Sequence, residues 1–144
     1  MYEPIRTKSV HSTPAASDLP HRSRDEELDL QLAGHLAALL AVTDELRGPA
    51  ADPELDAAAE RLSAEVARLR GGHAPVRAAA GAAGDPAPLH RRAHMLAGRA
   101  LVVAASRADT AAAILAAERM DAHSPEPTGQ ETAPAAPREL SAAR

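Results

Sequence analysis

The chain has 144 residues, no cysteine and a formal net charge of −4 at pH 7. This length limits it to one domain, and the lack of cysteine excludes disulfides, thiol catalysis, zinc ribbons and iron–sulfur clusters. Hydrophobic residues make up 45% of the chain, but 37 of them are alanine and only 24 are leucine, isoleucine or valine. Because alanine favours helices but buries little apolar area, the composition predicts helices around a small core.

Residues 1–22 contain three prolines among mostly polar residues, which predicts a disordered N-terminal arm. Its large apolar side chains include Tyr2, Ile5 and Val10, which leaves open that the arm docks on the body or on a partner. The arm lacks the apolar run of a signal peptide, and the chain has no charge-free apolar stretch long enough to span a bilayer. We therefore expect a cytoplasmic protein without a membrane span.

The first two predicted helices cover residues 24–47 and 53–70. Ser23 and Glu26 have the spacing of a capping box, and leucines then recur at intervals of three and four residues. Asp52 is a good N-cap for the second helix, and a proline follows it at the first helical position. Gly-Pro and Gly-Gly pairs end the two helices. Because the link between them is short, we expect an antiparallel hairpin.

The second half of the chain predicts one long helix after a flexible connection. Residues 71–85 are rich in glycine, alanine and proline, and they contain no phosphate-binding loop. A third helix is expected over 86–122, with one apolar seam starting at Leu89 and a second at Leu101. The hairpin alone cannot cover both seams. The polar residues 123–144 predict a disordered C-terminal tail.

These elements predict an all-α fold, in which a helical domain at 23–122 packs the hairpin on the longer third helix between disordered termini. The uncovered seam favours a homodimer or another protein as partner. The leading hypothesis is a non-enzymatic protein–protein interaction or accessory protein that self-associates. No general acid–base pair or nucleophile is specified, so no enzyme, cofactor or small-molecule substrate is indicated.

Two histidines are the residues most suggestive of a metal site. His90 and His94 are four residues apart, so their imidazoles project from one helix face, as in half of a zinc or nickel site. No carboxylate lies within one turn, and a third ligand would have to come from His35, His73 or another chain. The residues therefore favour an exposed basic helix start over a metal site.

Arg91, Arg92 and Arg99 predict a basic surface that offers contact to an anion or a nucleic acid. No aromatic residues or helix-turn-helix pattern accompany them. Residues 25–60 carry ten acidic residues and one basic residue, so ion pairing within the protein is favoured over nucleic acid. The acidic partners expected for these arginines are Asp29, Asp44 and Glu45. The alternative function is a small ligand-, metal- or nucleic-acid-binding regulator that uses this His/Arg cluster.

Three polar residues, His35, Arg107 and Thr110, fall on the apolar seams of the predicted helices. Polar groups in a seam often fix the register or the number of partners at some cost in stability. Alternatively, these residues line a small ligand pocket, but we favour a role in setting the register between helices.

The segment GRALVVAASRADTAAAILAAERMDAH and the opening MYEPIRTKSVH are similar to small uncharacterised Ala/Arg-rich helical proteins of Streptomyces-type actinobacteria. The resemblance covers about half the chain. It implies a high-GC bacterial, cytoplasmic origin, and it transfers no functional residue.

Overall fold

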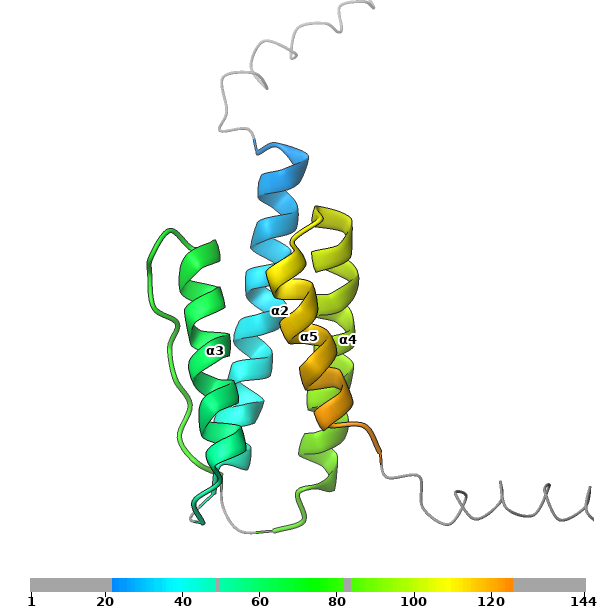
Figure 1. Cartoon of the computed structure of the whole chain (residues 1–144). Helices are drawn as coiled ribbons and strands as arrows, with labels where there is room; N and C mark the ends of the chain where they lie inside the picture. Colours follow the sequence, from blue (N-terminus) through cyan, green and yellow to red (C-terminus); the bar gives the residue numbers. More distant parts are fainter. Residues whose placement is uncertain (1–21, 49, 82–83, 126–144) are drawn as a thin grey trace, which may run out of the picture.

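The computed structural model describes residues 22–48, 50–81 and 84–125 (Figure 1). Within these residues it consists of four α-helices and contains no strand, which confirms the all-α class. The helices are α2 (Arg24–Leu46), α3 (Pro53–Leu69), α4 (Ala87–Arg107) and α5 (Thr110–Ala122). None of the described helices is both long and apolar enough to cross a membrane. The predicted N-terminal arm lies almost entirely outside the described residues.

Helices α2 and α3 begin and end within one residue of their predicted bounds, because local signals fix their ends. The Ser23 hydroxyl accepts a hydrogen bond from the Glu26 backbone N–H at 3.1 Å, and the Glu26 carboxylate accepts one from the Ser23 backbone N–H at 2.9 Å. Asp52 accepts hydrogen bonds from two backbone N–H groups of the first turn of α3. Each cap satisfies backbone donors that an isolated helix end leaves unpaired.

The single third helix predicted over 86–122 is wrong, because the chain breaks between α4 and α5. Ala108 adopts the left-handed conformation, with φ of 60°. The backbone N–H of Asp109 donates to the Ala104 carbonyl at 2.9 Å, which closes the end of α4. The Asp109 side chain then accepts from the backbone N–H of Ala112 and caps α5. Two residues thus end one helix and start the next.

The four helices form two antiparallel hairpins, α2–α3 and α4–α5, joined by a long crossover at 70–86 (Figure 1). Helix α2 packs against both α3 and α4, α5 packs on α4, and α3 touches α5 at the remaining side. The predicted three-helix arrangement is therefore replaced by four helices. The second seam of the predicted long helix is covered by α5 of the same chain, so helix length alone no longer requires a partner.

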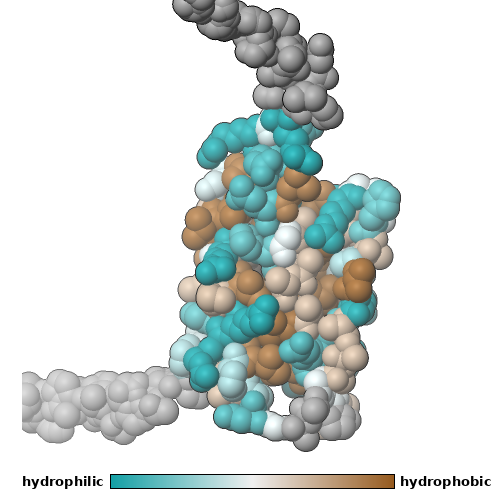
Figure 2. Space-filling view, turned by 180° about the vertical axis from the view of Figure 1, so that it is seen from behind, coloured by the Kyte–Doolittle hydropathy of each residue, from teal (hydrophilic) through white to brown (hydrophobic). Residues whose placement is uncertain are grey.

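The core is made of large side chains from the first hairpin and alanines from the second. The largest side chains that are fully buried come from α2 and α3, namely Leu32, Leu36, Leu39, Leu40, Thr43, Leu62 and Val66. The buried residues of α4 and α5 are mainly alanine, which lets these helices approach closely but contributes little apolar area. On the face seen in Figure 2, apolar surface lies in several patches separated by hydrophilic side chains.

Candidate functional site

The two histidines at the start of α4 do not point toward a common position at which a metal ion could bind. The Nδ1 atom of His94 donates to the backbone carbonyl of Met120 at 2.9 Å, which ties α4 to α5. His90 instead places Nδ1 2.9 Å from Nδ1 of His123. In the described part of the chain, no three side chains of the types that ligate metals are grouped so as to hold an ion. These histidines therefore hold the start of α4 against the end of α5.

His123 and Arg119 are polar residues that sequence reasoning missed. Both are 3% exposed, although residue 123 was assigned to the tail. Nη2 of Arg119 lies 3.1 Å from Nε2 of His123, and Nη1 of Arg119 pairs with Glu54 at the start of α3. Because Arg119 can only donate, His123 accepts at Nε2 and donates from Nδ1 to His90. The available signal was the spacing of Arg119 and His123, four residues apart on one helix face.

This network keeps His123 neutral. Burial, and then the positive charge of Arg119, lower the pKa of His123 to about 4. An imidazole with such a pKa is neutral at pH 7 and keeps one ring proton, so with that proton on Nδ1 its Nε2 accepts from Arg119. The network joins α3, α4 and α5, and it leaves Nε of Arg119 as a buried side-chain atom without a hydrogen-bond partner among the described residues.

A hollow of about 520 Å³ lies beside these histidines, between the start of α4 and the end of α5. Its oxygen-bearing side chains are Asp85 and Ser124. The Asp85 carboxylate accepts from the Ala87 backbone N–H at 3.0 Å, and the Ser124 hydroxyl donates to the Met120 carbonyl at 3.1 Å. Both side chains thus form hydrogen bonds with backbone groups at the ends of helices. The lining offers no activated nucleophile, because neither group is placed beside a base.

Arg91, Arg92 and Arg99 lie exposed on α4 and make no ion pair with any described residue. Two of their three expected acidic partners are engaged elsewhere. Asp29 pairs with Arg107 at 3.0 Å, and Asp44 pairs with other arginines of the α2 end and the crossover. The prediction that these arginines are neutralised by α2 is therefore wrong, and they form an exposed basic row.

The three polar seam residues have separate surroundings. His35 on α2 is half-buried, and burial together with the charge of Arg99 lowers its pKa. Arg107 at the end of α4 pairs with Asp29 of α2. Thr110 is the exposed first residue of α5. Of the three, only Arg107 joins two helices. Its partner is the Asp29 carboxylate and not another of the polar seam residues.

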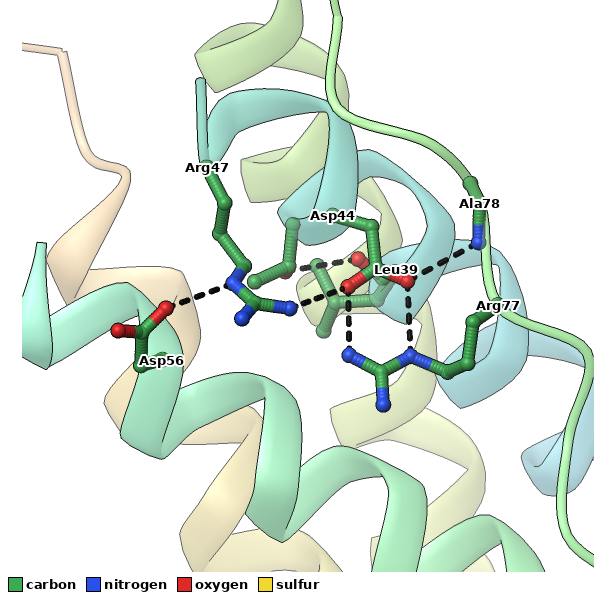
Figure 3. Close-up of polar contacts among 7 residues, drawn as sticks. Leu39, Asp44, Arg47, Asp56, Arg77 and Ala78 are labelled. Carbon is green, nitrogen blue, oxygen red and sulfur yellow. Dashed lines mark hydrogen bonds and ion pairs between the residues drawn. The ribbon is translucent and has the colours of Figure 1, made fainter. Parts of the chain in front are cut away.

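Asp44 anchors the crossover on the end of α2 (Figure 3). Its side chain accepts two hydrogen bonds from the Arg77 guanidinium, at 2.7 and 2.9 Å, and one from the Ala78 backbone N–H at 3.1 Å. Arg47 adds a fourth contact and also bonds Asp56 of α3. Burial acts to raise the pKa of Asp44, but these hydrogen bonds outweigh it and lower the pKa. Every acceptor position is occupied, so this buried charge holds structure together.

An apolar surface on α4 and α5 is left uncovered by the other described helices. Its large side chains are Met95, Val102 and Ile114, which are 45%, 66% and 52% exposed. Between the two helices, a shallow groove of about 280 Å³ is lined mainly by alanines and by Ile114. We define the apolar strip as this set of residues: Met95, Val102, Ala105, Ala113, Ile114 and Ala117.

The two edges of the apolar strip carry opposite charge. Successive helical residues are about 100° apart, so Arg92 and Arg99 follow Val102 around α4 on the side away from α5. By the same geometry, Asp121 lies within about 20° of Ile114, two turns further along α5, and Glu118 follows on the side away from α4. Glu118 also pairs with Arg61 of α3 at 2.7 Å but stays half-exposed. The strip is therefore bordered by a basic edge on α4 and an acidic edge on α5.

Comparison with protein families, with curated proteins and with solved structures found no match to this chain. What the protein does is therefore inferred from its own residues.

Proposed function

We propose that the protein is a non-enzymatic helical interaction protein that works as a homodimer, with the apolar strip as its contact surface. The observation that carries this proposal is the exposure of Met95, Val102 and Ile114 on one face of the α4–α5 hairpin. A large apolar side chain gains about 1.5–3 kcal/mol on full burial. In a two-fold dimer each of these half-exposed side chains is buried twice, once in each copy.

A second copy fits this face better than an unrelated partner does, because the face is self-complementary. Its basic edge on α4 and its acidic edge on α5 belong to the same surface. A two-fold interface presents the same patch from both sides, so opposite charges at opposite edges attract across it.

Sedimentation equilibrium of the full chain, from about 1 to 200 μM, tests this proposal across the affinity range of weak dimers. We expect the wild type to be in monomer–dimer equilibrium and the Val102→Glu variant to associate at least about tenfold more weakly, since it places a charge in the contact. Val76→Glu is the matched control, because Val76 is a valine 92% exposed on the crossover. It should dimerise like the wild type.

Two results would overturn the proposal: a wild-type monomer at every concentration, or Val102→Glu dimerising as tightly as the control. Circular dichroism of both variants shows whether they keep their helices, which is expected because both side chains are exposed.

The alternative function is a regulator that binds an anion or a nucleic acid through the basic row of Arg91, Arg92 and Arg99, whose exposure favours it. Titration with duplex DNA at two salt concentrations separates the two functions, because phosphate contacts weaken steeply with salt. Salt-dependent DNA binding by a protein that stays monomeric would favour this alternative.

A further inference from the structure

We infer that the two copies pair about a two-fold axis parallel to the helices, so that α4 of each copy lies over α5 of its partner. In this arrangement Arg92 and Arg99 of one copy face Asp121 and Glu118 of the other. The inference rests on the proposed self-association through the apolar strip and adds the orientation of the dimer and the residues that fix it.

The charged edges lie at the same height along the hairpin. His94 donates to the Met120 carbonyl, which places the first half of α4 beside the last turns of α5. A Cβ atom added at Gly98 would lie 3.6 Å from Sδ of Met120, so Gly98 is level with the same turn. Arg92 and Arg99 stand on either side of this level, and Asp121 follows Met120 directly. The two edges are therefore side by side on the hairpin.

The charges select one of the two face-to-face arrangements. A two-fold axis parallel to the helices leaves each residue at the same position along the helix direction. It also brings the α4 side of one copy opposite the α5 side of the other, so the basic edge meets the partner's acidic edge. An axis that crosses the helices places α4 on α4, and then Arg99 approaches the basic row of the partner. Like charges brought together at an interface cost several kcal/mol, so the parallel axis is preferred.

The groups needed for these contacts are available. Arg92, Arg99 and Asp121 are exposed and form no ion pair with the described residues. Glu118 is half-exposed beside Arg61. The interface thus adds ion pairs at its rim without breaking a buried contact, which favours specificity and orientation more than affinity.

Two charge reversals in the full chain test the orientation. Arg99→Glu places a carboxylate opposite the partner's Asp121, and Asp121→Arg places a guanidinium opposite the partner's Arg99. At low ionic strength each variant alone should dimerise about tenfold more weakly than the wild type. An equimolar mixture of the two should form heterodimers within about threefold of wild-type affinity, because both charge contacts then become attractive.

The outcomes separate the orientation from the proposed function. A monomeric wild type refutes both. A wild-type dimer that is weakened by Val102→Glu, but is insensitive to either charge reversal or is not restored in the mixture, refutes only the orientation. If α4 instead faced α4 and α5 faced α5, Arg99→Glu or Asp121→Arg mixed with the wild type would each bind more tightly than either protein alone, because each mixture would bring opposite charges together.

Discussion

Buried polar side chains decide much of the geometry at the level of single residues. Four polar residues are buried in the described part of the chain, namely Thr43, Asp44, Arg119 and His123. The Thr43 hydroxyl donates to the Leu39 carbonyl at 2.8 Å within α2. The other three side chains connect different elements. A buried polar group without a partner costs about 1–3 kcal/mol, so these contacts restrict which helices can lie together.

The buried imidazole of His123 makes stability depend on pH. Its pKa is about 4 in the folded protein, whereas an unfolded histidine has a pKa of about 6.5. Between these values the unfolded chain binds more protons, so stability rises with pH in this window. The contribution of His123 is complete above about pH 6.5 and is lost as the pH falls toward 4. Its size is roughly 3 kcal/mol for a shift of this order.

We therefore expect His123→Gln to flatten the pH dependence of the free energy of unfolding. Glutamine still offers an acceptor and a donor but does not titrate. Urea unfolding of wild type and variant at several values between pH 4 and 7 measures the effect. The gap between the two curves should change with pH by up to about 3 kcal/mol. Parallel curves would show that His123 is not held neutral by its surroundings.

The break between α4 and α5 is the element that sequence analysis could not place. The segment SRADT has no glycine or proline, the usual residues at a helix end. Its one local signal is Asp109, a good N-cap residue, which the unbroken apolar pattern concealed. An alanine in the left-handed conformation is disfavoured by about 1–2 kcal/mol. Tertiary packing of α5 on α4 has to offset that cost.

Glycine at the break should stabilise the protein. Ala108→Gly removes the steric cost of φ at 60°, and we expect a gain of about 1 kcal/mol after the higher entropy of the unfolded chain is subtracted. The matched control is Ala57→Gly at an exposed position inside α3, which should lose about 1 kcal/mol. Urea unfolding measures both. Equal losses at the two positions would mean that Ala108 carries no conformational strain.

The predictable parts of the fold are those fixed by neighbouring residues. The caps at Ser23 and Asp52 gave α2 and α3 nearly to the residue. The apolar seam that starts at Leu89 is buried at Ala93, Leu96 and Ala100, but its continuation at helical spacing reaches Ile114, which is 52% exposed. The reason is physical, since the break at Ala108 resets the angular position of every later residue. For the same reason the apolar strip and its charged edges emerge only once α5 is seen beside α4.

At the scale of the whole molecule, a core rich in alanine predicts a monomer of modest stability, to which dimerisation adds by mass action. The thermal midpoint should therefore depend on protein concentration. Between about 5 and 200 μM we expect the wild-type midpoint to rise by roughly 2–5 °C, followed by circular dichroism. The midpoint of Val102→Glu should change much less. A wild-type midpoint independent of concentration would argue against any coupling of folding to association.

The crossover held by Asp44 has one more consequence, for how the two hairpins find each other. It acts as a tether that confines the α4–α5 hairpin near α2. Short flexible tethers produce effective concentrations in about the millimolar range, equivalent to about 4 kcal/mol of binding free energy. The hydrogen bonds from Arg77 and Ala78 to Asp44 hold the crossover on the end of α2 and so raise that concentration. The contact between the large side chains of α2 and the alanines of α4 is thereby strengthened by being made within one chain.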